Sequence, residues 1–143
     1  MVMKPRHHRF LDEARVSAAI ALAERSTDAP IAVFVAPHFW GSVRLTAQRS
    51  LDRRGLTRSP GRNAVLFFIV PSRREFAIVG DDGAHLAVGQ PTWDAIAAAL
   101  RERLATGDPT DGVVRAIEEI GRHLAHHFPR SDSNLSPSIV ASD

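Results

Sequence analysis

The sequence predicts an α/β fold, a three-layer α/β/α sandwich with a small mixed β-sheet. The hydrophobic pattern follows the order helix, strand, helix, strand, strand, helix, helix. Residues 31–36 and 64–70 are apolar at every position, which is typical of strands that helices cover on both faces. Together these two observations favour a sheet enclosed between helical layers.

The first half of the chain is predicted to supply a helix, a strand and a second helix. Apolar residues recur at three- and four-residue spacing from Phe10 to about Arg25, which indicates an amphipathic helix. The short apolar segment Ile31 to Ala36 follows Pro30 and is predicted as a strand. From Ser42 to about Arg54, apolar residues recur every four positions among arginines, which indicates a short basic helix.

The second half supplies two strands and two helices. The apolar segment Asn63 to Val70 is the predicted central strand, and the turn residues 71–74 lead back into a strand from Glu75 to Val79. Pro91 suits the first turn of a helix that ends at Gly107. Asp108 suits the N-cap of a last helix, whose apolar stripe ends at Phe128.

The order of these elements predicts which loops meet. A strand, a crossover helix and a second strand form a right-handed parallel unit, and the tight turn adds an antiparallel neighbour. The starts of the first two strands and the end of the third then share one end of the sheet. We therefore expect Asp28, Asn63, Asp81 and Asp82 to converge there, where residues 80–83 end the third strand.

The chain is predicted to form one domain, residues 10–128, between a basic N-terminal arm, residues 1–9, and a disordered tail, residues 129–143. The arm lacks the apolar stretch of a signal peptide, so we expect a soluble cytoplasmic protein without a membrane span. The chain has no cysteine, which excludes thiol nucleophiles and cysteine-ligated zinc.

Charge is distributed unevenly along the chain, although the formal net charge is only +2. Residues 44–74 carry eight basic residues and one acidic residue, whereas residues 75–143 carry five and eleven. We expect the basic surface around Arg49, Arg53 and Arg54 to bind an acidic protein partner; the alternative is self-association with the acidic C-terminal half of a second copy. Nucleic-acid binding is disfavoured because the aromatic residues of this segment fall in the predicted buried strand.

Phe39 and Trp40 follow the first predicted strand in a loop. The two side chains could anchor the acidic protein partner, or they could cap the edge of the sheet.

Several motifs in fixed order resemble the TPM domain family over roughly residues 10–128. They include the Thr in AERSTDAPIAVFV before the first strand, the Asn-led strand and Val-Gly-Asp in GRNAVLFFIVPSRREFAIVGDDG, and GDPTDGVV at the start of the last helix. The family usually has Asn-Gly-Val-Leu where this chain has Ala64 as the second residue, and a glutamate where it has Pro30. The resemblance implies a mixed sheet between helices. Family members include thylakoid-lumen proteins linked to photosystem II repair and acid phosphatase activity, and some members bind calcium.

The converging oxygen ligands predict a site for a hard cation. Calcium prefers six to eight carboxylate and carbonyl oxygens. The candidate ligands for Ca²⁺ are Asp28, the amide oxygen of Asn63, Asp81, Asp82 and Asp111. The alternative is that residues 80–83 form a solvated turn in which aspartate bonds its own backbone.

The sequence therefore predicts a binding or assembly module that holds a divalent cation. The alternative function, implied by the resemblance, is a metal-dependent acid phosphatase acting on phosphomonoesters. Such an enzyme would need a metal-activated water, because no cysteine or aspartyl-phosphate motif supplies a nucleophile. His123 and His127 lie one helical turn apart, as zinc ligands do, but a structural role is favoured because no third ligand is evident.

Overall fold

A computed structural model describes residues 10–36 and 39–131. The helices and strands follow the predicted order with one addition, the short helix α3. The elements in chain order are α1 (Glu13–Glu24), β1 (Ile31–Val35), α2 (Val43–Arg53), β2 (Val65–Val70), β3 (Glu75–Gly80), α3 (Asp82–Val88), α4 (Gln90–Thr106) and α5 (Pro109–His127). Two 3₁₀ turns, η2 (Leu56–Arg58) and η3 (Pro71–Arg73), precede β2 and β3.

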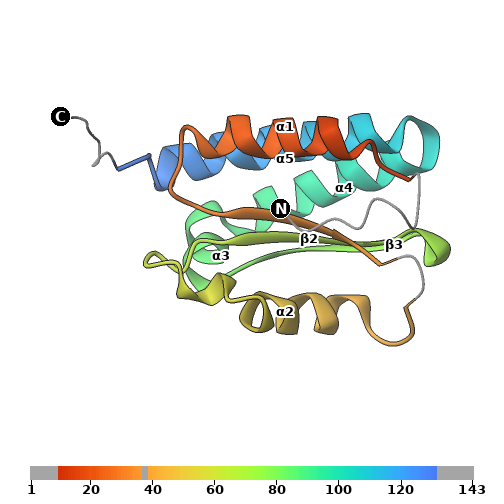
Figure 1. Cartoon of the computed structure of the whole chain (residues 1–143), viewed down its shortest axis with the longest axis horizontal. Coiled ribbons are helices and arrows are strands. Elements are labelled where there is room, and N and C mark those ends of the chain that lie inside the picture. The colour runs from red at the N-terminus through yellow and green to blue at the C-terminus, as the bar shows by residue number, and fades with distance from the viewer. Residues whose placement is uncertain (1–9, 37–38, 132–143) are drawn as a thin grey trace.

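The three strands form one mixed sheet in the order β1-β2-β3. β1 pairs in parallel with β2, and β2 pairs antiparallel with β3, as the sequence predicts. Figure 1 shows α2 alone on one face of this sheet and α1, α4 and α5 on the other, which confirms the three-layer α/β/α sandwich. β2 is the central strand and is buried at all six positions.

Two apolar clusters hold the layers together. The larger one joins alternate residues of the strands to α1, α4 and α5, and its most deeply buried members include Phe67, Ile117 and Leu124. The smaller one joins the opposite face of the sheet to α2 through residues such as Ala47 and Phe68. The strands therefore need apolar residues at every position, which explains their unbroken hydrophobic runs.

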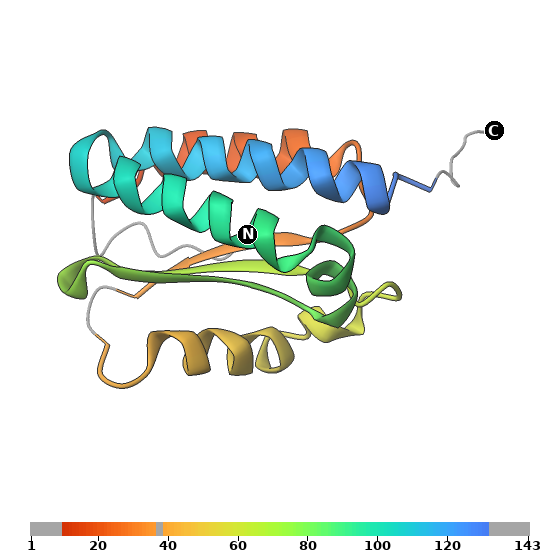
Figure 2. The ribbon, with the colours of Figure 1, turned by 180° about the vertical axis from the view of Figure 1, so that it is seen from behind.

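Asp108 caps α5 as the sequence predicts, and Ser42 caps α2 in the same way. Ser42 and Asp108 cap the N-termini of α2 and α5, because their side-chain oxygens accept hydrogen bonds from Leu45 and Thr110 at 3.1 and 3.0 Å. Figure 2, seen from behind, shows α4 crossing the sheet beside α5.

The region after β3 differs from the prediction. Residues 80–83 are predicted to end the strand, with a solvated turn as the alternative to a cation site, but Asp81 is the N-cap of α3 and residues 82–88 are helical. The N–H of Ala84 donates to the carbonyl of Arg62 at 3.2 Å, so the first turn of α3 lies against the loop before β2. At Gly83, a Cβ atom would lie 2.2 Å from the carbonyl oxygen of Gly61, so only glycine permits this approach.

Residues 129–131 differ from the predicted tail. Pro129 forms an isolated antiparallel bridge with Thr27, and the N–H of Arg130 donates to the carbonyl of Ser26 at 3.2 Å. Residues 129–131 are thus fixed to the segment before β1. The rest of the predicted tail, and the predicted arm at residues 1–9, lie outside the described residues.

Candidate functional site

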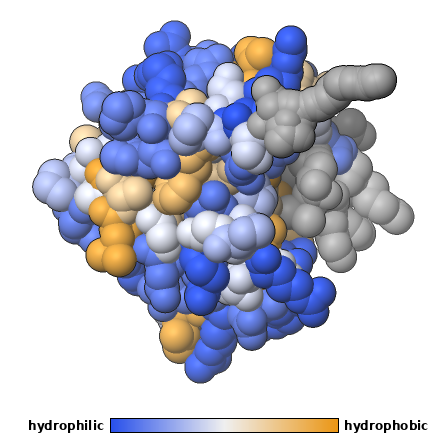
Figure 3. Space-filling view, turned by 90° about the vertical axis from the view of Figure 1, so that its left-hand side faces the viewer, coloured by the Kyte–Doolittle hydropathy of each residue, from blue (hydrophilic) through white to orange (hydrophobic). Residues whose placement is uncertain are grey.

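The predicted end of the sheet is assembled from the starts of β1 and β2 and the end of β3. The N–H of Val65 donates to the carbonyl of Pro30, and the N–H of Asp81 donates to the carbonyl of Ala64, both at 2.9 Å. These bonds bring the loops before β1 and β2 next to the end of β3. Figure 3 views this end of the molecule, where hydrophilic residues surround a few apolar patches.

Asp81 is the most buried carboxylate of this end, with 4% of its surface exposed. Arg62 donates to it through two hydrogen bonds, from Nε to Oδ2 at 2.6 Å and from Nη2 to Oδ1 at 2.8 Å. Its Oδ1 also accepts the N–H of Asp82 at 2.9 Å, at the start of α3. The hydrogen bonds and charge of Arg62 hold the pKa of Asp81 below its usual value, so this carboxylate stays ionised.

Arg62 is a site residue that no pattern in the sequence indicates. Its backbone adopts a left-handed conformation with φ of 50°, which non-glycine residues rarely adopt. This conformation lies in the loop against which α3 packs, where the carbonyl of Arg62 accepts the N–H of Ala84. The guanidinium of Arg62 balances the negative charge of the ionised Asp81 carboxylate.

The other predicted ligands at this end are also engaged. The amide oxygen of Asn63 accepts a hydrogen bond from the Ser59 hydroxyl at 2.5 Å, and Asn63 is buried. Asp82 is exposed, and its carboxylate lies 3.8 Å from the Arg62 guanidinium. Asp81, Asn63 and Asp82 are therefore neighbours, but in this conformation their oxygen atoms bind protein donors or face solvent.

Asp28 belongs to a separate contact at the same end. Both of its carboxylate oxygens accept the N–H of Ser131 at 3.1 Å, and Arg130 lies 3.9 Å away. Hydrogen bonds from Ser131 and the positive charge of Arg130 hold the pKa of Asp28 below its usual value. Asp28 thus fixes residues 130–131 to the domain.

Asp111 does not join this end of the sheet. It lies in the first turn of α5, and its carboxylate pairs with Arg115 at 2.9 Å and with Arg15 at 3.9 Å. The other end of α5 meets Asp28, because the N–H of Asp28 donates to the carbonyl of Phe128 at 3.2 Å. Asp111 and Phe128 are 17 positions apart along α5, at roughly 1.5 Å each. The expectation that Asp111 shares a site with Asp28 is therefore wrong.

The part of the chain that the structure describes holds no group of three or more His, Cys, Asp or Glu residues that could bind a metal ion. His126 and His127 stack edge to face at 4.8 Å near the end of α5. We call the end of the sheet that holds Asn63, Asp81 and Asp82 the acidic end. Any cation there would need ligands other than carboxylates, such as the Asn63 amide oxygen.

A carboxylate does occupy the start of β1, although Pro30 replaces the glutamate that the family pattern has there. The Glu24 carboxylate at the end of α1 accepts the N–H of Ile31 at 2.8 Å. Its position in sequence gives no signal of this role, because the contact depends on how α1 packs against β1. In this structure Glu24 stabilises the start of the strand.

The predicted basic surface lies on α2. Arg44, Arg49 and Arg53 are exposed, and none of them forms an ion pair among the described residues. Arg54 differs, because its guanidinium lies over the Phe34 ring at 4.0 Å. Burial and the nearby charge of Arg53 lower the pKa of Arg54. Arg54 therefore has a structural role in addition to its charge.

The two aromatic residues before α2 have different positions. The Phe39 ring packs against Phe68 with centroids 5.6 Å apart, so it caps the smaller apolar cluster. Trp40 is 92% exposed. Arg73 fixes this loop by donating to the carbonyl of Gly41 at 2.6 Å. Trp40 is the residue of the pair that is free to contact a partner.

The fold defines a small α/β/α sandwich with a three-stranded mixed sheet and an acidic end opposite the β2–β3 turn. The sequence matches the family described as the TPM domain over residues 9–123, and the chain belongs to this family. None of the curated proteins matches the chain in sequence. Among the described residues, no helix combines the length and apolar character needed to cross a membrane.

Solved structures share this fold at low sequence identity. The BA42 protein of the psychrophilic bacterium Bizionia argentinensis has a TM-score of 0.81 and 23% identity, over 98% of this chain and 100% of that one. The N-terminal domain of cg2496 from Corynebacterium glutamicum has a TM-score of 0.68 and 20% identity, over 96% and 84%. The N-terminal domain of a protein from P. gingivalis has a TM-score of 0.72 and 15% identity, over 89% and 85%.

Proposed function

We propose that this TPM domain is a binding module that docks an acidic protein partner on the exposed face of α2. The observation that carries the proposal is the set of exposed arginines on α2 that lack an acidic partner among the described residues. α2 forms a layer of its own, so this face is open along the whole helix (Figure 1). Trp40 precedes the Ser42 cap of α2 and supplies an exposed aromatic anchor beside the charges.

Binding to an acidic probe tests this proposal. The probes are polyglutamate, duplex DNA and anionic lipid vesicles, each titrated over a range of salt concentrations. We expect polyglutamate to bind, and Arg49→Glu combined with Arg53→Glu to weaken binding roughly tenfold or more, since charge reversal opposes the acidic probe. Arg122→Glu on α5 is the matched control, because Arg122 is exposed in the opposite layer.

Equal loss of binding in the Arg122 variant would contradict a role for α2, because it would indicate a nonspecific charge effect. Tight binding of DNA or vesicles without binding of polyglutamate would contradict a protein partner. It would indicate that α2 binds a nucleic acid or an anionic membrane surface.

Calcium binding at the acidic end is a second candidate, supported by the proximity of Asp81, Asp82 and Asn63 at the end of β3 and the start of β2. Because Arg62 holds Asp81, an arriving cation must displace that guanidinium. The Arg62→Ala variant should therefore bind calcium more tightly than the native chain, and Asp81→Ala with Asp82→Ala should abolish binding. NMR amide shifts during a calcium titration measure both effects.

Absence of saturable shifts up to millimolar calcium, in the native chain and in Arg62→Ala, would exclude this calcium site.

A metal-dependent acid phosphatase is the alternative function that the same residues could serve. Turnover of a phosphomonoester that requires a divalent cation and disappears in the Asp81→Ala, Asp82→Ala variant would support the enzyme.

A further inference from the structure

The outer edge of β3 is a second exposed surface, which meets the binding face of α2 at Arg44. β3 is the last strand of the sheet, and its N–H and C=O groups alternate between β2 and the opposite side. The N–H of Asp81 donates to the carbonyl of Ala64, which directly precedes β2, so the alternation directs the N–H and C=O groups of Phe76 and Ile78 away from β2. Within the described ranges, no hydrogen bond outside the β2–β3 ladder involves the backbone of Phe76 or Ile78.

The two edges of the sheet differ in how accessible they are. On β1, Val33 and Val35 are fully buried, and Glu24 binds the first N–H of the strand. On β3, Phe76 and Ile78 are half-buried and retain contact with solvent. An unpaired and accessible edge can pair with an added strand. Of the two edges, β3 is the one open to a ligand.

Three adjoining hollows follow the edge of β3. One of about 360 Å³ lies between η3 and α4, one of about 560 Å³ reaches the start of α2, and one of about 110 Å³ reaches Trp93. Phe76 and Arg101 line all three, so the hollows form one groove along the strand. The groove has the position that an extended peptide occupies when it extends a sheet.

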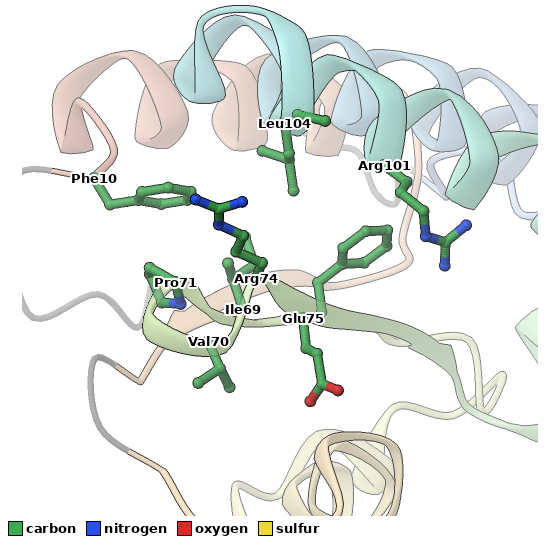
Figure 4. A pocket seen from close by; sticks show the side chains of 10 residues that line it. Phe10, Ile69, Val70, Pro71, Arg74, Glu75, Arg101 and Leu104 are labelled. Atoms are coloured by element: carbon green, nitrogen blue, oxygen red, sulfur yellow. The ribbon is translucent and has the colours of Figure 1, made fainter.

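The first hollow combines apolar and cationic side chains. In Figure 4, Phe10 and Leu104 approach from the helical layer, and the Arg74 side chain extends between them from the β2–β3 turn. Glu75 points away from these residues toward α2. This hollow therefore suits an apolar side chain flanked by an acidic one.

The charges along the groove favour an acidic ligand. Arg44, Arg74 and Arg101 line it and form no ion pair among the described residues. Of the two acidic side chains that line the groove, Glu75 is paired with Arg73 at 2.8 Å, and Asp94 accepts a hydrogen bond from the Gln90 side chain at 2.8 Å. Arg101 lies 5.4 Å from the centroid of the Phe76 ring, which places its charge beside the open edge.

We propose that the edge of β3 binds an extended segment of a protein partner as a fourth strand, with acidic residues of the segment on Arg44, Arg74 and Arg101. Backbone hydrogen bonds to Phe76 and Ile78 supply the pairing. The arginines and the Phe10–Leu104 hollow select the side chains. This site shares Arg44 with α2 but includes neither Arg49 nor Arg53, and it does not depend on the partner proposed for α2.

A library of short random peptides displayed on phage, selected on the immobilised full chain, tests the proposal. We expect enriched peptides to alternate acidic and apolar residues and to contain no proline at their centre. In an NMR titration, an enriched peptide should shift the amides of residues 75–79. Combined Arg44→Glu and Arg101→Glu substitutions should weaken its binding roughly tenfold or more.

Ile78→Pro tests the backbone pairing itself. The N–H of Ile78 points away from β2, so proline removes the outer donor without removing a bond of the β2–β3 ladder. We expect this variant to lose peptide binding while retaining the amide spectrum of the helices. Arg49→Glu with Arg53→Glu is the control and should bind the enriched peptide as the native chain does, even if polyglutamate binding at α2 fails.

Three results would overturn the proposal. The first is enrichment of no peptides, or of basic ones. The second is an enriched peptide that binds the folded Ile78→Pro variant with native affinity. The third is a concentration-dependent dimer in sedimentation that Ile78→Pro dissolves, which would identify a second copy of this chain as the occupant.

Discussion

Asp81 combines three roles at a single position. It caps α3, binds Arg62 through both oxygens and lies at the end of β3, where the sequence predicts a cation ligand. Its burial makes an unpaired charge costly, so the structure provides a partner on the adjacent loop. The same ion pair that stabilises the fold thus opposes the metal site that the acidic residues suggest.

The lowered pKa of Asp81 predicts a pH dependence of stability. Above the unfolded-state value of about 4, the carboxylate is ionised in both states and the ion pair contributes fully. As pH falls through the unfolded and then the folded pKa, the unfolded chain takes up the proton first, so this stability is lost. Asp81→Asn keeps the cap but removes the charge, and should cost about 1 kcal/mol at pH 7.

Urea unfolding between pH 3 and pH 7 measures the effect. The difference between the native chain and Asp81→Asn should narrow as pH falls below about 4. Asp94→Asn, an exposed position on α4, is the control and should stay close to the native curve. A difference that stays constant with pH would mean that the ion pair contributes nothing to stability.

At the scale of elements, hydrophobic periodicity predicts long segments well and short ones poorly. The strands and α1, α2, α4 and α5 lie where the pattern predicts them, because each buries a stripe or face of its own. α3 is missed because its seven residues begin with Asp-Gly, which is typical of a turn. Only the close approach at Gly83 to the carbonyl of Gly61 explains why glycine suits a helix there.

The candidate site shows the same limit. The order of strands is sufficient to predict that Asn63, Asp81 and Asp82 share one end of the sheet. The strand order does not predict that Arg62 binds the carboxylate of Asp81, because that contact depends on the left-handed backbone of Arg62 in the loop before β2. Glu24 is missed for a related reason, since it reaches the start of β1 through the packing of α1.

At the scale of the whole molecule, the layers make the two edges of the sheet unequal. The apolar cluster beneath α1, α4 and α5 includes Val33 and Val35 and encloses β1. α2 packs against the opposite face and leaves the outer side of β3 between two helical layers. The molecule therefore presents one strand edge and one basic helical face to its surroundings.

Hydrogen exchange along β3 tests this arrangement in the isolated chain. Antiparallel pairing directs the N–H groups of Ala77 and Val79 into the ladder with β2, and those of Phe76 and Ile78 outward. We expect the two outward amides to exchange at least about tenfold faster than their two neighbours. The amides of the central strand β2 are the reference for full protection. Equal protection from Phe76 to Val79 would show that another segment already pairs with this edge, which would leave no place for an added strand.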